Sequence, residues 1–376
     1  MQTFRDVPVM PLQALREHDP LGGPVWPDFE AQTTARFCRL PGVPVDALPT
    51  EEPCEEEITE DAIWGGYLHP HFGHLVSEHL TRVLPGIHAR PDDLVLFMIE
   101  KDRDPEQVAP HFHDVLNWYG VRRDRVRIIS RPTLARRLSV VPQGEVLWGK
   151  APDAGYLDLL DALPDRHGID PVPGDIVYVT RAGLAAKGQG SHLGESYLVQ
   201  LLQELGVTIF DPAGLSIRAQ LERYAGARTL IFAEGSALHG RQLLGRVRQE
   251  VYVLKRRVRY LARPMLRPRV RKLTYLNTNG GVLKMRDRDG RGYPHLNAVF
   301  YRTDALLDGF QAMGLDLRSR WDQQAYLAAA LGDAAAWEQA RHEDKVPAER
   351  NMQVYLAEMS AAIKGISSVP PSFLAG

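Results

Sequence analysis

A histidine-rich segment, residues 69–82, carries the side chains best suited to chemistry. At the roughly 100° per residue of a helix, its apolar residues fall on one face and a polar stripe lies nearly opposite. The stripe consists of His71, His74, Glu78 and Arg82. Imidazole and carboxylate groups can take a proton from a substrate hydroxyl, and a guanidinium can bind an anion. An amphipathic helix with its polar side in water explains the same spacing, so both interpretations stay open.

Gly73 favours a functional site at this segment. Glycine lowers the stability of a helix, so a purely structural helix gains nothing from it in its first turn. We therefore expect something to approach the backbone closely at Gly73. In this interpretation His71 and Glu78 are candidate bases, and His74 and Arg82 are supporting polar groups in a cleft.

A metal site is an alternative for the same segment. His69, His71 and His74 are close in sequence, and imidazole is the commonest transition-metal ligand. No carboxylate follows at the spacing of a recognised metalloprotease motif. We therefore expect neither a bound metal nor a cofactor, and a metal-dependent hydrolase is kept only as a third hypothesis.

A second candidate site is the segment 233–240, which follows a predicted buried strand and opens a predicted helix. Ligands of doubly wound sheets sit at such strand ends, and a helix start suits an anion. Gly235 would let phosphates approach the backbone, and Ser236 could cap the helix or donate to an oxygen. Glu234 at the strand tip is a further candidate base. A tight turn with a serine cap remains the simpler explanation.

Arg181 follows another predicted strand, residues 176–180, at the same edge of the sheet. A guanidinium there could pair with a departing diphosphate. A surface arginine with no ligand is an equally good explanation for this residue taken alone.

The chain alternates strands and helices, which predicts an α/β protein with two domains and a cleft between them. Residues 1–62 are proline-rich and are predicted to form an irregular lead-in. Residues 63–165 are predicted to form an N-terminal α/β domain, and residues 166–275 a C-terminal α/β domain with a doubly wound parallel sheet. Residues 276–376 are predicted to be turn-rich and then helical, with a helix at 352–364.

Composition limits the partners and the compartment. The formal net charge of -2 gives no reason to expect nucleic acid binding. Charged residues interrupt the first twenty positions, and no stretch is apolar enough to span a membrane, so we expect a cytoplasmic protein. Its two cysteines, Cys38 and Cys54, are expected to be free thiols.

Three segments together resemble glycosyltransferase family 61. The first resembles the family's His-Phe-Gly-His element followed by Glu and Arg. The second resembles a strand that ends in Arg before a helix with an early Glu. The third resembles a helix that begins at Ser and carries Gln, followed by a strand that ends in Gly-Ser-x-Leu. The matching residues are His71, Phe72, Gly73, His74, Glu78, Arg82, Arg181, Glu195, Ser216, Gln220, Ala227 and Gly235 to Leu238.

The resemblance implies a GT-B-like pair of Rossmann-like domains facing across a cleft, with 63–165 as the acceptor-side domain and 166–275 as the nucleotide-sugar-binding domain. It further implies a metal-independent reaction and inversion at the anomeric carbon. It also implies that Arg181, Glu195, Gly235, Ser236 and His239 bind the donor. Two positions depart from the family, because Ala233-Glu234 stands where a Gly-x-His is common and Gly194 where an Asn is common. Since both lie where the donor would be recognised, the resemblance does not imply a particular donor.

The predicted function is transfer of a sugar from a nucleotide-sugar donor to a glycan or lipid-linked acceptor, in surface polysaccharide synthesis. The alternative is a non-catalytic protein that binds an anionic polymer or membrane surface. It would use nine basic residues in the stretch 255–272, although Pro264 and Pro268 interrupt that stretch. The same stretch would also allow an enzyme to contact an anionic membrane at its inner face.

Overall fold

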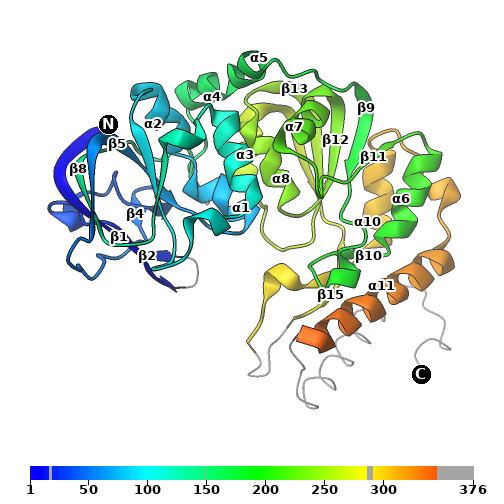
Figure 1. Cartoon of the computed structure of the whole chain (residues 1–376). Coiled ribbons are helices and arrows are strands. Elements are labelled where there is room, and N and C mark those ends of the chain that lie inside the picture. Colours follow the sequence, from blue (N-terminus) through cyan, green and yellow to red (C-terminus); the bar gives the residue numbers. More distant parts are fainter. Residues whose placement is uncertain (17–18, 148, 286–290, 345–376) are drawn as a thin grey trace.

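The computed structural model describes residues 1–16, 19–147, 149–285 and 291–344. The protein is a mixed α/β structure with two halves and a C-terminal part (Figure 1). The first half is drawn in blue and cyan, and the second in green and yellow-green. The orange helix α11 lies below the second half.

The first half is built on a six-stranded sheet of order β2-β1-β8-β5-β6-β7. Strands β8, β5, β6 and β7 are parallel, and β1 and β2 extend the sheet in antiparallel fashion. The bounds are β1 Gln2–Arg16, β2 Asp19–Pro24, β5 Glu56–Tyr67, β6 Leu94–Met98, β7 Val126–Ile129 and β8 Thr133–Val140. Two short strands, β3 Cys38–Leu40 and β4 Val43–Pro44, pair with each other beside it.

The predicted irregular lead-in is therefore wrong for much of residues 1–62. Strand β1 pairs along most of its length with β8, from Gln2 opposite Val140 to Val9 opposite Thr133. Pro8 lies within this pairing, opposite Leu134, and Pro11 lies where the register of β1 with β2 shifts, between Met10 and Ala14. A bulge of this kind accommodates a residue without an N–H donor.

The helices of the first half are α1 Phe72–His74, α2 Val83–Ala89 and α3 Pro110–Tyr119, followed by α4 Ala154–Asp161 and α5 Leu163–His167 at the connection to the second half. Helix α3 ends at Gly120, which adopts the left-handed conformation at φ 88° that favours glycine.

The second half is built on a five-stranded parallel sheet of order β11-β9-β12-β13-β14. The strands are β9 Gly174–Val179, β11 Thr208–Phe210, β12 Ala227–Ala233, β13 Val247–Leu254 and β14 Val270–Leu276. The helices are α6 Glu195–Glu204, α7 Ile217–Gly226, α8 Ala237–Gly240 and α9 Arg263–Leu266. The predicted parallel alternation is confirmed, and the order reverses between β9 and β12, where doubly wound sheets bind ligands.

Local features of this half follow from sequence. The apolar runs of β9, β12 and β13 are buried on both faces, as expected of parallel strands covered by helices. Ser216 caps α7 by accepting from the backbone N–H of Ala219 at 3.2 Å, as predicted. Helix α8 is shorter than predicted, because only residues 237–240 are α-helical before a 3-10 turn at 241–243.

The C-terminal part contains strands that the sequence did not indicate. Strands β15 Asn279–Leu283 and β16 Ala298–Tyr301 form a small sheet with β10 His192–Leu193, and helices α10 Thr303–Gln311 and α11 Gln323–Asp344 follow. The helix predicted at 352–364 lies outside the described residues. None of the described helices is long and apolar enough to cross a membrane.

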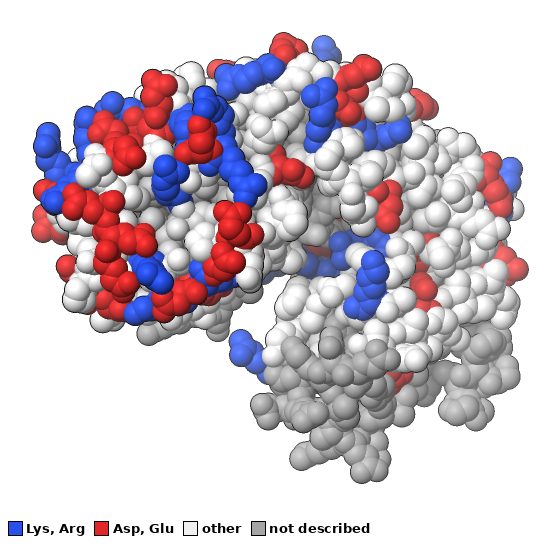
Figure 2. Space-filling model, in the orientation of Figure 1, with Lys and Arg blue, Asp and Glu red and all other residues white. Residues whose placement is uncertain are grey.

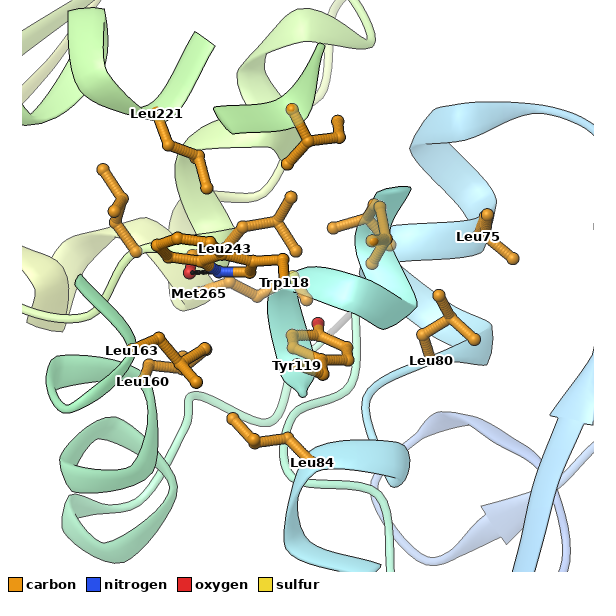
Figure 3. Packing of buried hydrophobic residues seen from close by; sticks show 14 of the residues in the cluster. Leu75, Leu80, Leu84, Trp118, Tyr119, Leu160, Leu163, Leu221, Leu243 and Met265 are labelled. Carbon is orange, nitrogen blue, oxygen red and sulfur yellow. Dashed lines mark hydrogen bonds between the residues drawn. The ribbon is translucent and has the colours of Figure 1, made fainter. Parts of the chain in front are cut away.

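One hydrophobic cluster joins the two halves. Helix α1 packs on α8 and α3 packs on α7, so buried residues of both sheets belong to a continuous core. Within it the indole of Trp118 donates to the backbone oxygen of Leu243 at 2.9 Å, surrounded by leucines from both halves (Figure 3). A buried ion pair between Glu145 and Arg269, 2.7 Å apart, adds a second link. The halves therefore hold a fixed relative position.

Candidate active site between the two halves

The histidine-rich segment, residues 69–82, does not form the regular helix that its spacing predicts. It forms α1, then a π-helical turn at Leu75–His79 in which the N–H of Leu80 bonds to the oxygen of Leu75 at 2.9 Å, and only then α2. A π-turn inserts an extra residue per turn, so it changes which side chains share a face. Residues 75–84 are all buried, so Glu78 and Arg82 do not face water, whereas His71 is exposed and His74 is half-buried.

Glu78 is the centre of a buried polar group in the first half. It accepts from His74 Nδ1 at 2.5 Å and from Arg39 Nε and Nη2 at 2.9 and 3.2 Å. Burial alone would raise the pKa of Glu78, but the hydrogen bonds from His74 and Arg39 lower it below its usual range. An ionised carboxylate only accepts hydrogen bonds, so Glu78 requires a proton on Nδ1 of His74. Arg39, on β3, was not predicted from the sequence.

Arg82 does not reach this polar group. Its guanidinium donates to the backbone oxygens of Ala35 and Arg36 at 2.7 and 2.9 Å, and its side chain is buried. These bonds hold the N-terminal segment, including the strand that carries Arg39, against the first half. The structure therefore gives Arg82 a supporting role, but through the backbone of residues 35–36 and not within a cleft.

The backbone of Gly73 is approached closely, as expected, and the approaching group is a side chain of the second half. A Cβ atom at Gly73 would lie 3.0 Å from Cδ2 of His239 and 3.1 Å from Cε1 of His71. His239 is on α8, so the two imidazoles come from opposite halves and meet over Gly73. This is the point at which the two candidate segments of the sequence come together.

The groups around His71 show which parts of the chain line the contact between the two halves. The His71 residue is exposed, but the surrounding protein removes water from part of its ring, and this desolvation lowers its pKa to about 4. Electrostatic interactions with His74, His239, His295 and Arg257 add to the shift. These neighbours belong to the first half, the second half and the segment before β16. His71 is consequently neutral at neutral pH and able to accept a proton.

Glu234 follows β12 and is fully buried. Its Oε2 accepts from the backbone N–H groups of Arg256 and Arg257, at 2.5 and 2.9 Å, in the turn that follows β13. No hydrogen bond to its Oε1 is found among the described residues. The carboxylate thus fixes the turn that presents Arg257, and it has no open side toward a substrate hydroxyl.

Arg181 and Arg257 place two guanidinium groups at this edge of the sheet. Arg181 lies against Gly235, because a Cβ atom there would be 2.0 Å from its Nη1, and its Nη2 donates to the oxygen of Gly190 at 2.8 Å. Gly235 therefore makes room for Arg181. The Nε atoms of Arg181 and Arg257 are buried and have no hydrogen-bond partner among the described residues.

Arg181 is held in place by Glu195, the first residue of α6. Oε1 of Glu195 accepts from the backbone N–H of Arg181 at 2.7 Å, and from the hydroxyls of Thr180 and Tyr178 at 2.9 and 3.0 Å. Glu195 is itself buried, and burial raises its pKa. It therefore fixes the end of β9 and acts on a ligand only through Arg181.

Ser236 precedes α8 but makes no side-chain capping bond. With only four residues, α8 has a small dipole, so its start adds little to anion binding. The cationic side chains at the ends of β9 and β13 are the stronger anion-binding feature. Figure 2 shows Lys and Arg side chains inside the hollow between the two halves.

The basic stretch 255–272 is not a continuous surface patch. Lys255, Arg256 and Arg269 are buried, and Arg256 donates to the backbone oxygens of Asn297 and His295 at 2.6 and 3.1 Å. Arg271 and Lys272 both pair with Glu250. Much of the stretch therefore stabilises the fold, and Arg256 brings the segment with His295 to the site.

The described residues contain no group of three or more His, Cys, Asp or Glu side chains that could hold a metal ion. His69 packs against its histidine neighbours, with ring centroids 4.7 Å from His74 and 5.5 Å from His79. Cys38 and Cys54 are free thiols, as predicted.

Comparison with known proteins identifies the family. A family model described as Glycosyltransferase 61 matches residues 72–241. This match places residues 72–241 in glycosyltransferase family 61. The protein is thus a glycosyltransferase, and the resemblance seen in the sequence is confirmed. A search of curated proteins finds no match.

The family match runs from the start of α1 into the 3-10 turn after α8. It includes His74, Glu78, Arg181, Glu234 and His239. His71 lies one residue before it, and Arg39, Arg257 and His295 lie outside it. The site is therefore completed by parts of the chain that the match does not cover.

Proposed function

We propose that this family 61 enzyme is an inverting, metal-independent glycosyltransferase. It moves a sugar from a nucleotide-sugar donor to a hydroxyl of a glycan or lipid-linked acceptor, in surface polysaccharide synthesis. The proposal includes a GT-B-like arrangement of two Rossmann-like halves. One observation carries the proposal: Arg181 follows β9 and Arg257 follows β13, on either side of Glu234, which follows β12. His71 is among the neighbours of Arg257.

Three neighbouring strands, β9, β12 and β13, end at this place. A diphosphate bound here would meet two guanidinium groups, which can neutralise charge that other enzymes neutralise with a divalent metal ion. During transfer the bond between the anomeric carbon and the phosphate oxygen breaks, and the oxygen keeps the electron pair. Cations already in position stabilise that developing charge. Glu195 and Glu234 position the two arginines.

His71 is the base in this proposal. The acceptor oxygen attacks the anomeric carbon from the face opposite the phosphate, and its proton passes to the neutral imidazole of His71. Glu78 is a weaker choice because its pKa is lowered and its oxygens bind His74 and Arg39. Glu234 is a weaker choice because it is buried against the backbone of Arg256 and Arg257.

The basic stretch gives less support to the alternative of an anionic-polymer or membrane-binding protein, because several of its residues are buried or paired. A peripheral contact with an anionic membrane remains part of the proposal. Val258, 88% exposed, and the exposed Arg267 would provide it on the cytoplasmic side.

The test is turnover of uridine, guanosine and thymidine diphosphate sugars, measured as nucleoside diphosphate release with and without glycan acceptors. His71→Ala is expected to lower kcat about 100-fold or more, as for loss of a general base. Glu234→Gln is expected to act mainly on KM for the donor, and Glu78→Gln to give a smaller loss of kcat. Near-normal rates in all three folded variants would reject this assignment.

A further inference from the structure

A buried hydrogen-bond chain leads from the link between the two halves to the ring of His239. Arg269 Nη1 pairs with Glu145 Oε2 at 2.7 Å, and Arg269 Nη2 donates to Glu145 Oε1 at 3.1 Å. Gln242 Nε2 donates to the same Oε1 at 3.2 Å, and Gln242 Oε1 lies 2.5 Å from Nδ1 of His239. All four side chains are at least 96% buried.

The chain of donors and acceptors allows only one arrangement of protons. Glu145 Oε1 already accepts from Arg269, so the Gln242 atom that faces it must be the amide nitrogen. The sulfur of Met265, 3.1 Å from that nitrogen, is a weak acceptor and agrees with this orientation. The amide oxygen of Gln242 therefore faces His239 and can only accept, which places the ring proton on Nδ1.

The other ring nitrogen of His239 then carries a lone pair. Burial, as the largest cause, lowers the pKa of His239 to about 4, so the ring is neutral near neutral pH. Its Nε2 is bonded to Cδ2, the atom that faces Gly73 and the ring of His71. Nε2 makes no hydrogen bond with a described residue. A substrate hydroxyl is the chemical group that such a nitrogen would accept from.

We propose that Glu145 and Gln242 are positioning residues that fix the tautomer of His239, so that Nε2 accepts a hydrogen bond from a sugar hydroxyl bound beside His71. This inference rests on the proposed function and extends it to two residues buried at the contact between the halves. Glu145 lies in the connection between them, and Arg269 holds it there. The same residues therefore fix both the relative position of the halves and the state of one site histidine.

The first test needs no substrate. Nitrogen chemical shifts of the histidine rings in the wild-type protein, near neutral pH, report which ring nitrogen carries the proton, and the His239→Asn spectrum assigns the signals. We expect protonated Nδ1 and unprotonated Nε2 at His239. A proton on Nε2 would overturn the proposal, whatever the turnover experiments show. Failure of every nucleotide sugar to react would reject the proposed function and leave this measurement valid.

The second test compares two matched variants. Gln242→Met removes the amide that binds Nδ1, and we expect a mixed tautomer and a kcat about 10-fold to 100-fold lower, the range found when partners that orient metal-binding histidines are lost. Gln249→Met is the control, because Gln249 is equally buried but bonds to Arg241 and to backbone oxygens. Wild-type kcat in Gln242→Met despite a changed tautomer would overturn the contact between Nε2 and substrate. A tautomer that is unchanged in Gln242→Met would overturn the positioning role.

Discussion

Trp118 on α3 donates its indole N–H to the backbone oxygen of Leu243 at 2.9 Å, across the contact between the two halves. The indole is 3% exposed and lies in an apolar cluster to which both sheets contribute (Figure 3). A shared core of this kind makes hinge motion between the halves costly, because opening would expose apolar surface. Arg257 and His71, which lie near enough to influence each other's charge, are thus held in place before any ligand binds.

Trp118→Phe is expected to destabilise the protein while keeping one unfolding transition. The Leu243 oxygen would lose its buried partner, at a cost of about 1–3 kcal/mol in the free energy of unfolding. Urea denaturation followed by tryptophan fluorescence and circular dichroism measures this. Trp321→Phe is the control, because the indole N–H of Trp321 donates to nearby Gln323 within the C-terminal part and the residue is partly exposed. Two separate transitions in the wild type would contradict the shared core.

Arg257→Met is expected to weaken binding of a nucleoside diphosphate by about 10-fold to 100-fold, the usual range for a charge-assisted hydrogen bond. The change removes the cation and keeps a similar apolar length. Isothermal titration with uridine and guanosine diphosphate measures the affinity. Arg267→Met serves as the control, since Arg267 is exposed. Equal affinity in wild type and Arg257→Met would contradict the placement of the diphosphate.

The second half was largely predictable from the sequence, and the first half was not. Strands β9, β12 and β13 are continuous apolar runs followed by helices, so local pattern alone indicates parallel strands. Strand β1 is different, because its pairing partner β8 is more than a hundred residues away and its prolines resemble a loop. Only tertiary pairing makes it a strand. The π-turn at 75–79 likewise has no local signature, so the helical stripe was assigned to the wrong environment.

The site residues divide in the same way. Arg181 and Glu234 could be found because each follows a predicted strand at the ligand-binding edge. Arg257 also follows a strand, β13, at the ligand-binding edge. The sequence interpretation treated it as part of the basic stretch 255–272, and its position after a strand is the signal that distinguishes it. Arg39 had no such signal. Its bond to Glu78 depends on how β3 is held by Arg82, which only the folded chain shows.

Buried histidines make stability fall with acid. Burial lowers the pKa of His239 to about 4 and that of His79 and His192 to about 3, from an ordinary value of 6.5. Between about pH 6.5 and pH 4 the unfolded chain binds more protons than the folded one. The free energy of unfolding therefore decreases as pH falls through this window, by up to about 2 kcal/mol per histidine at pH 5.

Urea denaturation at about pH 7 and about pH 5 tests this dependence. His239→Asn is expected to reduce the difference in unfolding free energy between the two pH values, because it removes one of the groups that cause it. His88→Asn, at an exposed position, should keep the wild-type difference. A His239→Asn protein with the full wild-type difference would contradict the burial of a neutral ring at this position.

Gly73→Ala is expected to lower kcat with little loss of stability. The new methyl group would meet Cδ2 of His239 at 3.0 Å and Cε1 of His71 at 3.1 Å, so both rings must move by a few tenths of an ångström. Displacing a base from its reacting atom by about 1 Å can cost about 100-fold in rate, and this smaller shift should cost roughly 10-fold. Alanine also favours helix over glycine, which offsets part of the strain.

Gly332→Ala on α11 is the matched control for this change, because no heavy atom lies within 4 Å of a Cβ atom there. It should keep wild-type kcat and gain slightly in stability. The measurement is nucleoside diphosphate release at saturating donor, with melting temperatures taken on the same samples. If Gly73→Ala keeps the wild-type rate, the two imidazoles need not be close for transfer, and the role of their contact over Gly73 is reduced to packing between the halves.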